Sequence, residues 1–441
     1  MVDVAHDPLA HVPGDRGWPL VGHTLMFLRD ARGLTERNRQ RYGDVYRSRV
    51  LGRDGVTFLT PQATREVFLD PGKVLSSQGG WSNTIGDLFR NGLMLRDFDD
   101  HHRHRRVMQQ AFSRAALTGY VEAIHDVTDR HLRDLPDGDV DVYVLMKRLT
   151  LDIAAEVFVG VSLGAASERV NRAFQDSVAA SITPLRVALP GTPWRRGLQG
   201  RAELVRVFGD LVAARRREAE PRTDLLSRLA HATTDDGELL PADDVVDHMI
   251  FLMLAAHDTT TSTLAVLLWQ LALHPAEQDR VAAEVRALDD APVTPADHGD
   301  LVHTTRAMQE ALRLSPPVPF SPRRALADVE ITGVRVPAGT GVSVSSLALH
   351  RHPDWWTRPD AFDPDRFAPG REEHKQHSHL FVPFGGGAHL CIGNHVAEVM
   401  VKAIVARLLA TRRVTADPRA GVVISPIPIP KPKGPMLLTV R

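Results

Sequence analysis

Alternating apolar and polar residues mark the stretch DVYRSRVLGRDGVTFLT, residues 44–60. A period of two is typical of a β-strand with one buried face. Gly-Arg-Asp-Gly at the centre of the stretch (52–55) is turn-forming, so the pattern predicts a β-hairpin with its turn there.

From about residue 101 to 290 the apolar residues fall three and four apart, as in YVEAIHDVTDRHLRDL (120–135) and RVFGDLVAARRREAE (206–220). This spacing predicts amphipathic helices separated by polar loops. Beyond residue 320, VEITGVRVPAGTGVSVSSLAL (329–349) again has strand character, and one more helix is expected at about 393–411.

The longest predicted helix runs from Pro241 to His274, about 50 Å. Pro241 suits its first turn, Asp243 and Asp244 complement the helix dipole, and Pro275 follows its end. Apolar residues nearly encircle this segment, which predicts a helix through the middle of the molecule. The polar run HDTTTST (257–263) interrupts its apolar surface halfway along.

A proline-rich segment, VISPIPIPKPKGP (423–435), has two interpretations. It resembles ligands of proline-recognising domains, but its alternating Ile and Pro favour an edge strand or turn folded onto the body.

Composition narrows the class of protein. Of 441 residues, 43% are apolar and 24% charged, and the formal net charge is -1. These values exclude a disordered chain and give no overall bias toward nucleic acid or anionic lipid. The N-terminal segment lacks signal-peptide character, and the longest strongly apolar run, MIFLMLAA (249–256), is too short to span a bilayer. We expect a soluble, cytoplasmic protein without a membrane anchor.

The stretch FGGGAHLCIG (384–393) contains Cys391, the only cysteine of the chain. A thiolate is a soft metal ligand, and a glycine-rich loop allows close approach of a flat ligand. Because Gly393 directly precedes a predicted helix, backbone N–H groups and the helix dipole would favour a charged thiolate. A buried structural cysteine is the alternative that the cysteine alone would favour.

FGGGAHLCIG resembles the haem-binding loop of the cytochrome P450 monooxygenases. The matching residues are Phe384, Gly385, Gly387, His389, Cys391 and Gly393. The resemblance implies haem b (iron protoporphyrin IX), with Cys391 as the axial ligand of its iron.

Other motifs agree with this family in the expected order. Glu310 and Arg313 match its Glu-x-x-Arg helix, and FDPDRF (362–367) brings Arg366. The resemblance implies a buried network of these three side chains that holds the cysteine loop in place, although such a pair taken alone is usually a solvated ion pair.

The polar interruption of the long helix resembles the family's oxygen-activating signature. Ala255 and Ala256 would leave room for haem and dioxygen, and Asp258 and Thr259 would relay protons. A threonine hydroxyl bonded inward would open a local groove that admits water. Alternatively, these hydroxyls bond only the preceding turn, which we expect for Thr260 and Thr261.

Three sites resemble family positions that hold the haem propionates. His101 and Arg105 in DDHHRHRRVMQQAF (99–112) are one turn apart, Arg323 precedes a strand, and His389 lies in the cysteine loop. Clustered His and Arg also occur in transition-metal sites and nucleic-acid patches. Arg103 and Arg106 would face solvent, where the family docks its electron donors.

The resemblance covers nearly the whole chain and implies a soluble bacterial-type member. The fold expected is a single, mainly α domain (1–441) with a smaller β-rich region, α+β in class. The β-rich portions would lie at about 44–60 and 320–350 and the helical core at about 101–315. Haem would lie between the long central helix and the helix after the cysteine loop, residues 384–393.

The reaction implied is insertion of one atom of dioxygen into a C–H bond of an apolar small molecule. Residues 13–30, PGDRGWPLVGHTLMFLRD, resemble segments of members acting on retinoids, sterols and terpenoids. An apolar substrate pocket is expected from Leu254, Ala255, Val318, Phe320, Ile427 and Ile429.

Electrons are expected from a separate ferredoxin or flavodoxin with its reductase, and ultimately from NAD(P)H, because no flavin or iron–sulfur domain fits in this length. Two other functions stay open: a haem-thiolate peroxygenase or isomerase, and a non-enzymatic haem sensor. Asp258 and Thr259 argue against the first, and the lack of spare length for an output domain argues against the second.

Overall fold

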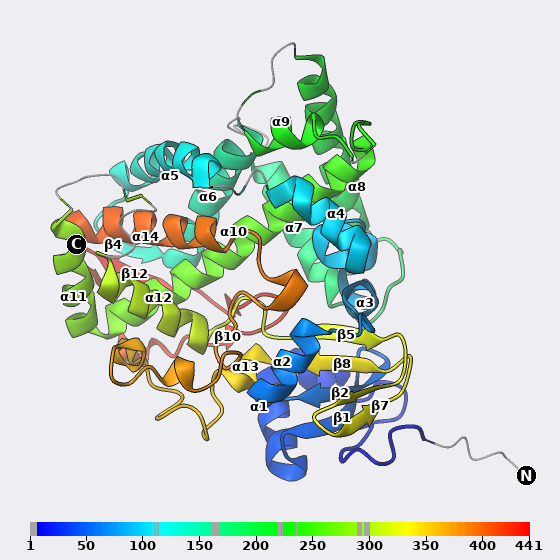
Figure 1. The fold of residues 1–441 in the computed structure, drawn as a ribbon. Coiled ribbons are helices and arrows are strands. Elements are labelled where there is room, and N and C mark those ends of the chain that lie inside the picture. The colour runs from blue at the N-terminus through cyan, green and yellow to red at the C-terminus, as the bar shows by residue number, and fades with distance from the viewer. Residues whose placement is uncertain are drawn as a thin grey trace, which may run out of the picture.

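The structure, a computed structural model, describes residues 7–109, 112, 114–160, 167–218, 222, 224–234, 236–288, 293–294 and 300–441. A large helical body and a smaller β-rich region pack side by side (Figure 1). The prediction of a mainly α chain with a smaller β-rich region is confirmed.

Fourteen α-helices are assigned within the described residues. They are α1 Thr24–Tyr42, α2 Pro61–Leu69, α3 Ser77–Phe89, α4 Phe98–Gln109, α5 Arg114–Arg133, α6 Val142–Ala154, α7 Ser167–Ser181, α8 Pro193–Arg217, α9 Leu225–Ala230, α10 Ala242–Leu273, α11 Pro275–Arg286, α12 Val302–Leu314, α13 Ser346–Leu349 and α14 Asn394–Thr411. The predicted helix over 206–220 is the C-terminal part of α8, and its Ala219 and Glu220 lie outside the described residues.

The main sheet has five strands in the order β1-β2-β8-β5-β3. These strands are β1 Val45–Val50, β2 Arg53–Phe58, β3 Leu75–Ser76, β5 Ser321–Ala325 and β8 Gly341–Val344. β2 and β8 pair in parallel, and the other neighbours pair antiparallel. The sheet therefore joins segments from near the two ends of the chain.

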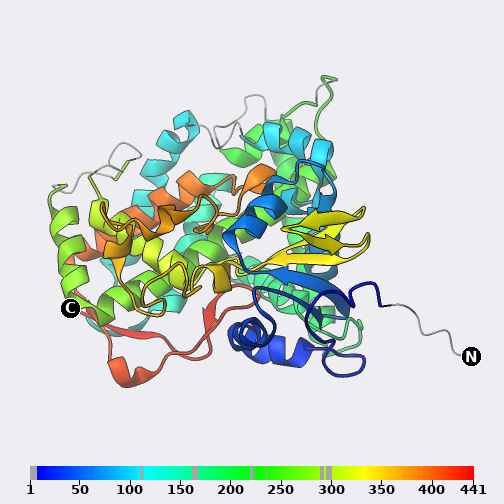
Figure 2. The same cartoon turned by 60° about the horizontal axis from the view of Figure 1, so that its bottom comes forward.

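Smaller sheets cover other parts of the molecule. β4 Gly138–Asp141, β12 Leu437–Val440 and β9 Val414–Thr415 form one, β6 Val329–Ile331 and β7 Val334–Val336 a hairpin, and β10 Ile424–Ser425 and β11 Lys431–Pro432 another pair. The strand interpretation of residues 423–435 is thus confirmed. Figure 2 shows this C-terminal segment reaching α1, where Lys433 Nζ donates to the carbonyl of Arg29 at 3.3 Å.

The predicted hairpin over 44–60 is confirmed, but its turn was placed wrongly. The turn residues are Leu51 and Gly52, both with positive φ (50° and 77°), and Arg53 to Gly55 belong to β2. A two-residue turn with two positive φ values matches the twist of paired strands. The end of the predicted strand region 329–349 is likewise helical, because the side chain of Ser345 caps α13 by accepting from the N–H of Ala348 at 3.3 Å.

Helix α10 runs through the middle of the helical body (Figure 1), as predicted. It is assigned without interruption from Ala242 to Leu273, and Pro241 is its N-cap residue instead of a first-turn residue. It is long and apolar enough to cross a membrane, but most of its surface is buried inside the protein, as in the core helix of a globular fold.

Two hydrophobic clusters stabilise the fold. The larger surrounds α10 and includes Leu264, Leu268 and Ile404 of α14, all fully buried. The smaller lies beneath the five-stranded sheet and includes Phe58 and Trp356.

Candidate active site

A cavity of about 240 Å³ opens between α10, α14, α4, α3 and the segment 382–393. It collects most of the residues that the sequence indicated. Those lining it are His101, Arg105, Ala255, Ala256, Thr259, Val318, Arg323, Phe384, Gly385, His389, Cys391 and Gly393.

Cys391 lies between a single 3₁₀ turn, Gly387–His389, and α14, whose N-cap residue is Gly393. Its N–H donates to the carbonyl of Phe384 at 2.9 Å, which closes the loop. The surface that Cys391 exposes belongs to the cavity.

The surroundings of the thiol only partly match the prediction. Burial raises the pKa of Cys391, whereas the N–H of Gly393 and the charge of Arg105 lower it without reversing that effect. The backbone therefore favours the thiolate, as expected, but burial outweighs it. A bound cation would supply the opposite charge that a thiolate requires here.

The glycines of this loop serve two different contacts. Gly387 has φ of 62°, and a Cβ on it would lie 1.8 Å from the carbonyl oxygen of Phe68 in α2. A Cβ on Gly386 would lie 2.6 Å from the Phe68 ring. Gly385, with φ of 73°, lines the cavity. Gly387 was expected to contact the cofactor, but it does not line the cavity. Its lack of a side chain instead makes room for α2.

Two imidazoles stack at the edge of the cavity. The rings of His101 and His389 are 4.0 Å apart, and the buried Nε2 of His101 has no hydrogen-bond partner. Burial, with nearby arginines, lowers the pKa of His101 to about 4 and that of His389 to about 2. Both rings are therefore neutral and able to donate one hydrogen bond each.

Two arginines face the same space. Burial lowers the pKa of Arg105, and it lowers that of Arg323 to about 10, although Asp97 and Asp70 act in the opposite direction. Among the described residues that line the cavity, none is Asp or Glu. A ligand carrying carboxylates would complement these cations and the unpartnered His101, and a soft iron would complement the thiol, so the donor set fits haem.

Thr259 lines the cavity, and its hydroxyl donates to the carbonyl of Ala255 one turn earlier. Thr261 donates in the same way to His257 at 2.8 Å, and Thr263 to Thr259 at 2.9 Å. These bonds follow the alternative in which hydroxyls bond the preceding turn. Helix α10 continues without a break through these threonines. The local groove expected from the sequence is therefore not formed by an interruption of the helix.

Asp258 points away from the cavity and pairs with Lys147 of α6 at 2.9 Å. Burial would raise the pKa of Asp258, but His257 and Lys147 outweigh it and lower that pKa. Nε2 of His257 is 3.2 Å from the carboxylate without hydrogen-bond geometry.

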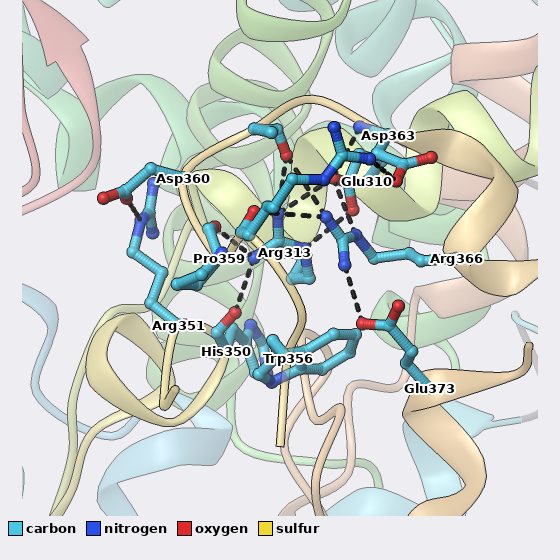
Figure 3. A network of polar contacts seen from close by, with 12 residues as sticks. Glu310, Arg313, His350, Arg351, Trp356, Pro359, Asp360, Asp363, Arg366 and Glu373 are labelled. Atoms are coloured by element: carbon cyan, nitrogen blue, oxygen red, sulfur yellow. Dashed lines mark hydrogen bonds and ion pairs between the residues drawn. The ribbon is translucent and has the colours of Figure 1, made fainter. Parts of the chain in front are cut away.

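Glu310, Arg313 and Arg366 are fully buried and in contact (Figure 3). Arg313 binds Glu310 through two bonds of 2.7 and 2.8 Å, and Arg366 donates to Glu310 at 3.0 Å. The two guanidinium groups also lie near the Trp356 ring, at 5.2 and 5.9 Å from its centroid.

This buried network extends to the segment before the cysteine loop and to a fourth charged residue. Arg313 donates to the carbonyl of His350 at 2.8 Å, and Nε2 of His350 accepts from the N–H of Val382, nine residues before Cys391, at 3.0 Å. Arg366 also binds Glu373 at 2.7 Å, a partner that the sequence did not indicate. The network thus leads through His350 to the backbone of Val382, two residues before the cysteine loop.

Only some of the predicted substrate-pocket residues line the cavity. Val318 and Ala255 line the cavity, whereas Leu254, Phe320, Ile427 and Ile429 do not. Leu254 lies on the opposite face of α10 from Ala256, and the ring of Phe320 packs on that of Phe27 at 5.3 Å. Ile427 and Ile429 belong to the small C-terminal sheet region between β10 and β11.

Sequence reasoning missed most of the aromatic lining, which includes Trp81, Phe112, Phe158 and Phe251. Only Phe251 had a signal, since it precedes Ala255 by one helical turn on the predicted helix. The other three reach the cavity through tertiary packing.

The side chains of the run HHRHRR (101–106) point in different directions. His101 and Arg105 face the cavity, His104 faces α10, and His102, Arg103 and Arg106 are exposed. Within the part of the chain that the structure describes, no three His, Cys, Asp or Glu side chains are placed to hold a metal ion. The alternative of a transition-metal site in this run therefore has no support.

Comparisons with known proteins agree with this geometry. The family model for cytochrome P450 matches residues 12–440. The putative cytochrome P450 136 of Mycobacterium tuberculosis is 38% identical over 442 residues, covering 98% of this chain and 89% of that protein. Abscisic acid 8'-hydroxylase 3 of Oryza sativa is 30% identical over 431 residues, covering 95% and 84%. The structure of retinoic acid bound cyanobacterial CYP120A1 superposes with a TM-score of 0.91 at 26% identity, covering 98% of this chain and 99% of that one.

Proposed function

Because the chain belongs to the cytochrome P450 family, whose members are haem-dependent monooxygenases, we propose that it hydroxylates an apolar small molecule of terpenoid, steroid or retinoid type. The family uses haem b and dioxygen, with electrons from NAD(P)H delivered through redox partners. The observation that carries the proposal is the cavity in which the lone thiol, two neutral imidazoles and two buried arginines face apolar and aromatic side chains.

Cys391 would bind the haem iron, and Arg105, Arg323, His101 and His389 would bind the propionates. When bound, haem with a thiolate ligand activates dioxygen for insertion of one oxygen atom into a C–H bond. Ala255 and Ala256 would leave space for the haem, because a methyl side chain projects little from the helix. Phe384, Gly385 and Gly393 would also contact it.

Thr259 would hold a proton donor at the cavity wall. Its hydroxyl is fixed by donation to Ala255, so its lone pairs are directed to the cavity side, where they can order a water molecule. Asp258 and Lys147 would act behind this wall, as a charged pair that organises proton transfer toward Thr259 without contacting substrate.

The substrate would be held mainly by apolar contact. Leu93, Met94, Leu252 and Val318 line the cavity with the aromatic residues Trp81, Phe112, Phe158 and Phe251. A rigid isoprenoid or polycyclic compound suits such a lining, because it loses little conformational entropy on binding. The names of two similar proteins include small-molecule acids, abscisic acid and retinoic acid.

The finer assignments complete this proposal. The chain would act as a single haem domain in the cytoplasm, with a ferredoxin or flavodoxin and its reductase as electron source. The donor would dock over the exposed Arg103 and Arg106 of α4, because their helix also carries Arg105 at the cavity. Glu310, Arg313 and Arg366 would keep the cysteine loop in place.

The test is the absorption spectrum of the reduced protein with carbon monoxide, on wild type and on Cys391→Ser. A red-shifted Soret band of thiolate type in the wild type, lost in the variant, is expected. A histidine-type spectrum that the variant leaves unchanged would overturn the proposal. Spin-state titration of the haem with apolar isoprenoids then tests the substrate class.

A further inference from the structure

Two histidines join α4 to α10. His104 Nδ1 lies 2.9 Å from His248 Nε2, and their ring centroids are 5.0 Å apart. His248 is fully buried. Two nitrogens bound to one tetrahedral zinc ion at about 2.0–2.1 Å each would lie about 3.3 Å apart, so the observed separation indicates a direct hydrogen bond.

The direction of this bond follows from the buried atom at its end. Nδ1 of His248 has no partner. A buried N–H without an acceptor costs about 1–3 kcal/mol, so this nitrogen is the unprotonated one. The proton of His248 is then on Nε2 and is donated to His104 Nδ1. The proton of His104 is on its own Nε2, which is 3.6 Å from a carboxylate oxygen of Asp100.

The surroundings of both rings favour the neutral form. Burial lowers the pKa of His104, with Arg96 next in effect. Burial, the neighbouring His104 and Arg96 lower the pKa of His248 well below its usual value.

Ion pairs close the link between the two helices. Arg96, just before α4, binds Asp100 at 2.9 Å and also binds Asp244, one turn before His248 on α10. A chain of contacts thus runs from Asp244 through Arg96, Asp100 and His104 to His248, here called the His104–His248 network. Three of its members are nearly buried, so the two helices cannot slide past one another without breaking these bonds.

The network stands between two walls of the cavity. On α4, His104 directly precedes Arg105 and is three residues after His101, and both of these line the cavity. On α10, Phe251 and Leu252 follow His248 by one turn and line the cavity too. A side chain placed at Gly92 would clash with Phe251, its Cβ lying 2.6 Å from the ring, so the chain before α4 also packs tightly on α10.

We propose that the His104–His248 hydrogen bond is a positioning device, which sets α4 against α10 and thereby the propionate-binding side chains against the substrate-facing wall. Neither histidine touches the cavity. This inference rests on the proposed function, because the effect runs through the haem that His101 and Arg105 would hold.

The test compares His104→Leu, which removes the acceptor, with His104→Asn, whose side-chain oxygen takes the place of Nδ1. His102→Leu is the matched control, since His102 is an exposed histidine on the same helix. The holoenzyme variants are assayed for haem transfer to apomyoglobin, for the reduction potential of the iron and for Tm. Loss of one buried hydrogen bond is expected to speed haem transfer about tenfold in His104→Leu, with a shifted potential.

Recovery of most of the wild-type haem retention and potential by His104→Asn, with His102→Leu unchanged, would support positioning. Equal behaviour of the Leu and Asn variants, or a lower Tm with unchanged haem transfer and potential, would overturn it. The double variant His104→Leu/His248→Leu covers the case of a single variant that does not fold, because no buried donor is then left without an acceptor. A double variant that retains haem as the wild type does also overturns the inference.

These outcomes are separate from those of the proposed function. A wild-type protein without the thiolate-type carbon monoxide spectrum contradicts the proposed function. If the wild type has that spectrum and all variants equal it in haem transfer and reduction potential, only the positioning role is contradicted.

Discussion

Lys147 of α6 donates to the buried carboxylate of Asp258 at 2.9 Å, and this pair lies outside the cavity that the next residue, Thr259, lines. The charged residue and the hydroxyl residue of one motif therefore lie on different sides of α10. The two can be tested separately.

We expect Lys147→Met to lower the free energy of unfolding by about 3–5 kcal/mol, because it leaves a buried carboxylate without its cation. Urea denaturation of the holoprotein measures this loss. In Lys147→Met/Asp258→Asn no charge remains, so most of the stability should return. A single variant within about 1 kcal/mol of wild type would mean that water solvates Asp258.

Thr259→Ala is expected to keep haem and substrate binding but to divert reducing equivalents to hydrogen peroxide. The methyl side chain cannot order a water molecule at the cavity wall. Product and peroxide are measured per NAD(P)H consumed, with Thr261→Ala as control, because Thr261 also donates to its preceding turn but is fully buried away from the cavity. Unchanged coupling of electrons to product in Thr259→Ala would contradict the assignment.

Arg105→Ala is expected to weaken haem retention far more than Arg106→Ala. Arg105 faces the cavity, whereas Arg106 is exposed on the other side of α4. A lost charge-assisted hydrogen bond to a buried carboxylate costs about 1.5–3 kcal/mol, or roughly tenfold to a hundredfold in haem dissociation. Haem transfer to apomyoglobin measures both variants, and equal rates would remove Arg105 from the propionate site.

Glu373 makes stability depend on pH. Burial alone would raise the pKa of this carboxyl, but hydrogen bonds from Thr357 and Arg371 and the charge of Arg366 lower it to about 2 from the usual 4.5. A folded-state pKa below the unfolded one stabilises above about pH 4.5, and that contribution is lost as the pH falls through about 2.

The matching experiment is the free energy of unfolding of wild type and Glu373→Gln from pH 7 to pH 3. We expect a difference of about 2 kcal/mol at neutral pH, less than the full shift implies because water screens part of the interaction, and a smaller one at pH 3. A difference that does not change with pH would assign the loss to packing.

Gly387→Ala is expected to destabilise the protein and release haem. The new Cβ would meet the Phe68 carbonyl, and the positive φ adds about 1–2 kcal/mol of strain. Gly370→Ala is the matched control, because Gly370 also has positive φ (89°) but open space around its Cβ. Equal losses of Tm in the two variants would show that backbone strain alone is responsible.

The parts predicted from sequence are those coded by local pattern or short motif. Helix α10 follows from its apolar periodicity and flanking prolines, and the placement of Cys391, Arg105 and Arg323 around one cavity follows from motifs. The buried contact of Glu310 with Arg366 needed the family resemblance, because spacing alone predicts only a surface pair.

The missed parts depend on contacts between distant segments. Lys147 is 111 residues from Asp258 and carries no motif. Phe158 and Phe112 reach the cavity through tertiary packing, and no local pattern distinguishes such residues from ordinary core. The bond between His104 and His248 spans 144 residues and is likewise invisible along the chain.

The parallel pairing of β2 with β8 has a consequence for biosynthesis. β2 ends at Phe58 and its partner begins only at Gly341, so the β1–β2 hairpin leaves the ribosome long before its second neighbour exists. At about 5–20 residues per second this delay lasts on the order of tens of seconds. Throughout that time the hairpin presents an open edge, the kind of surface on which nascent chains aggregate and chaperones bind.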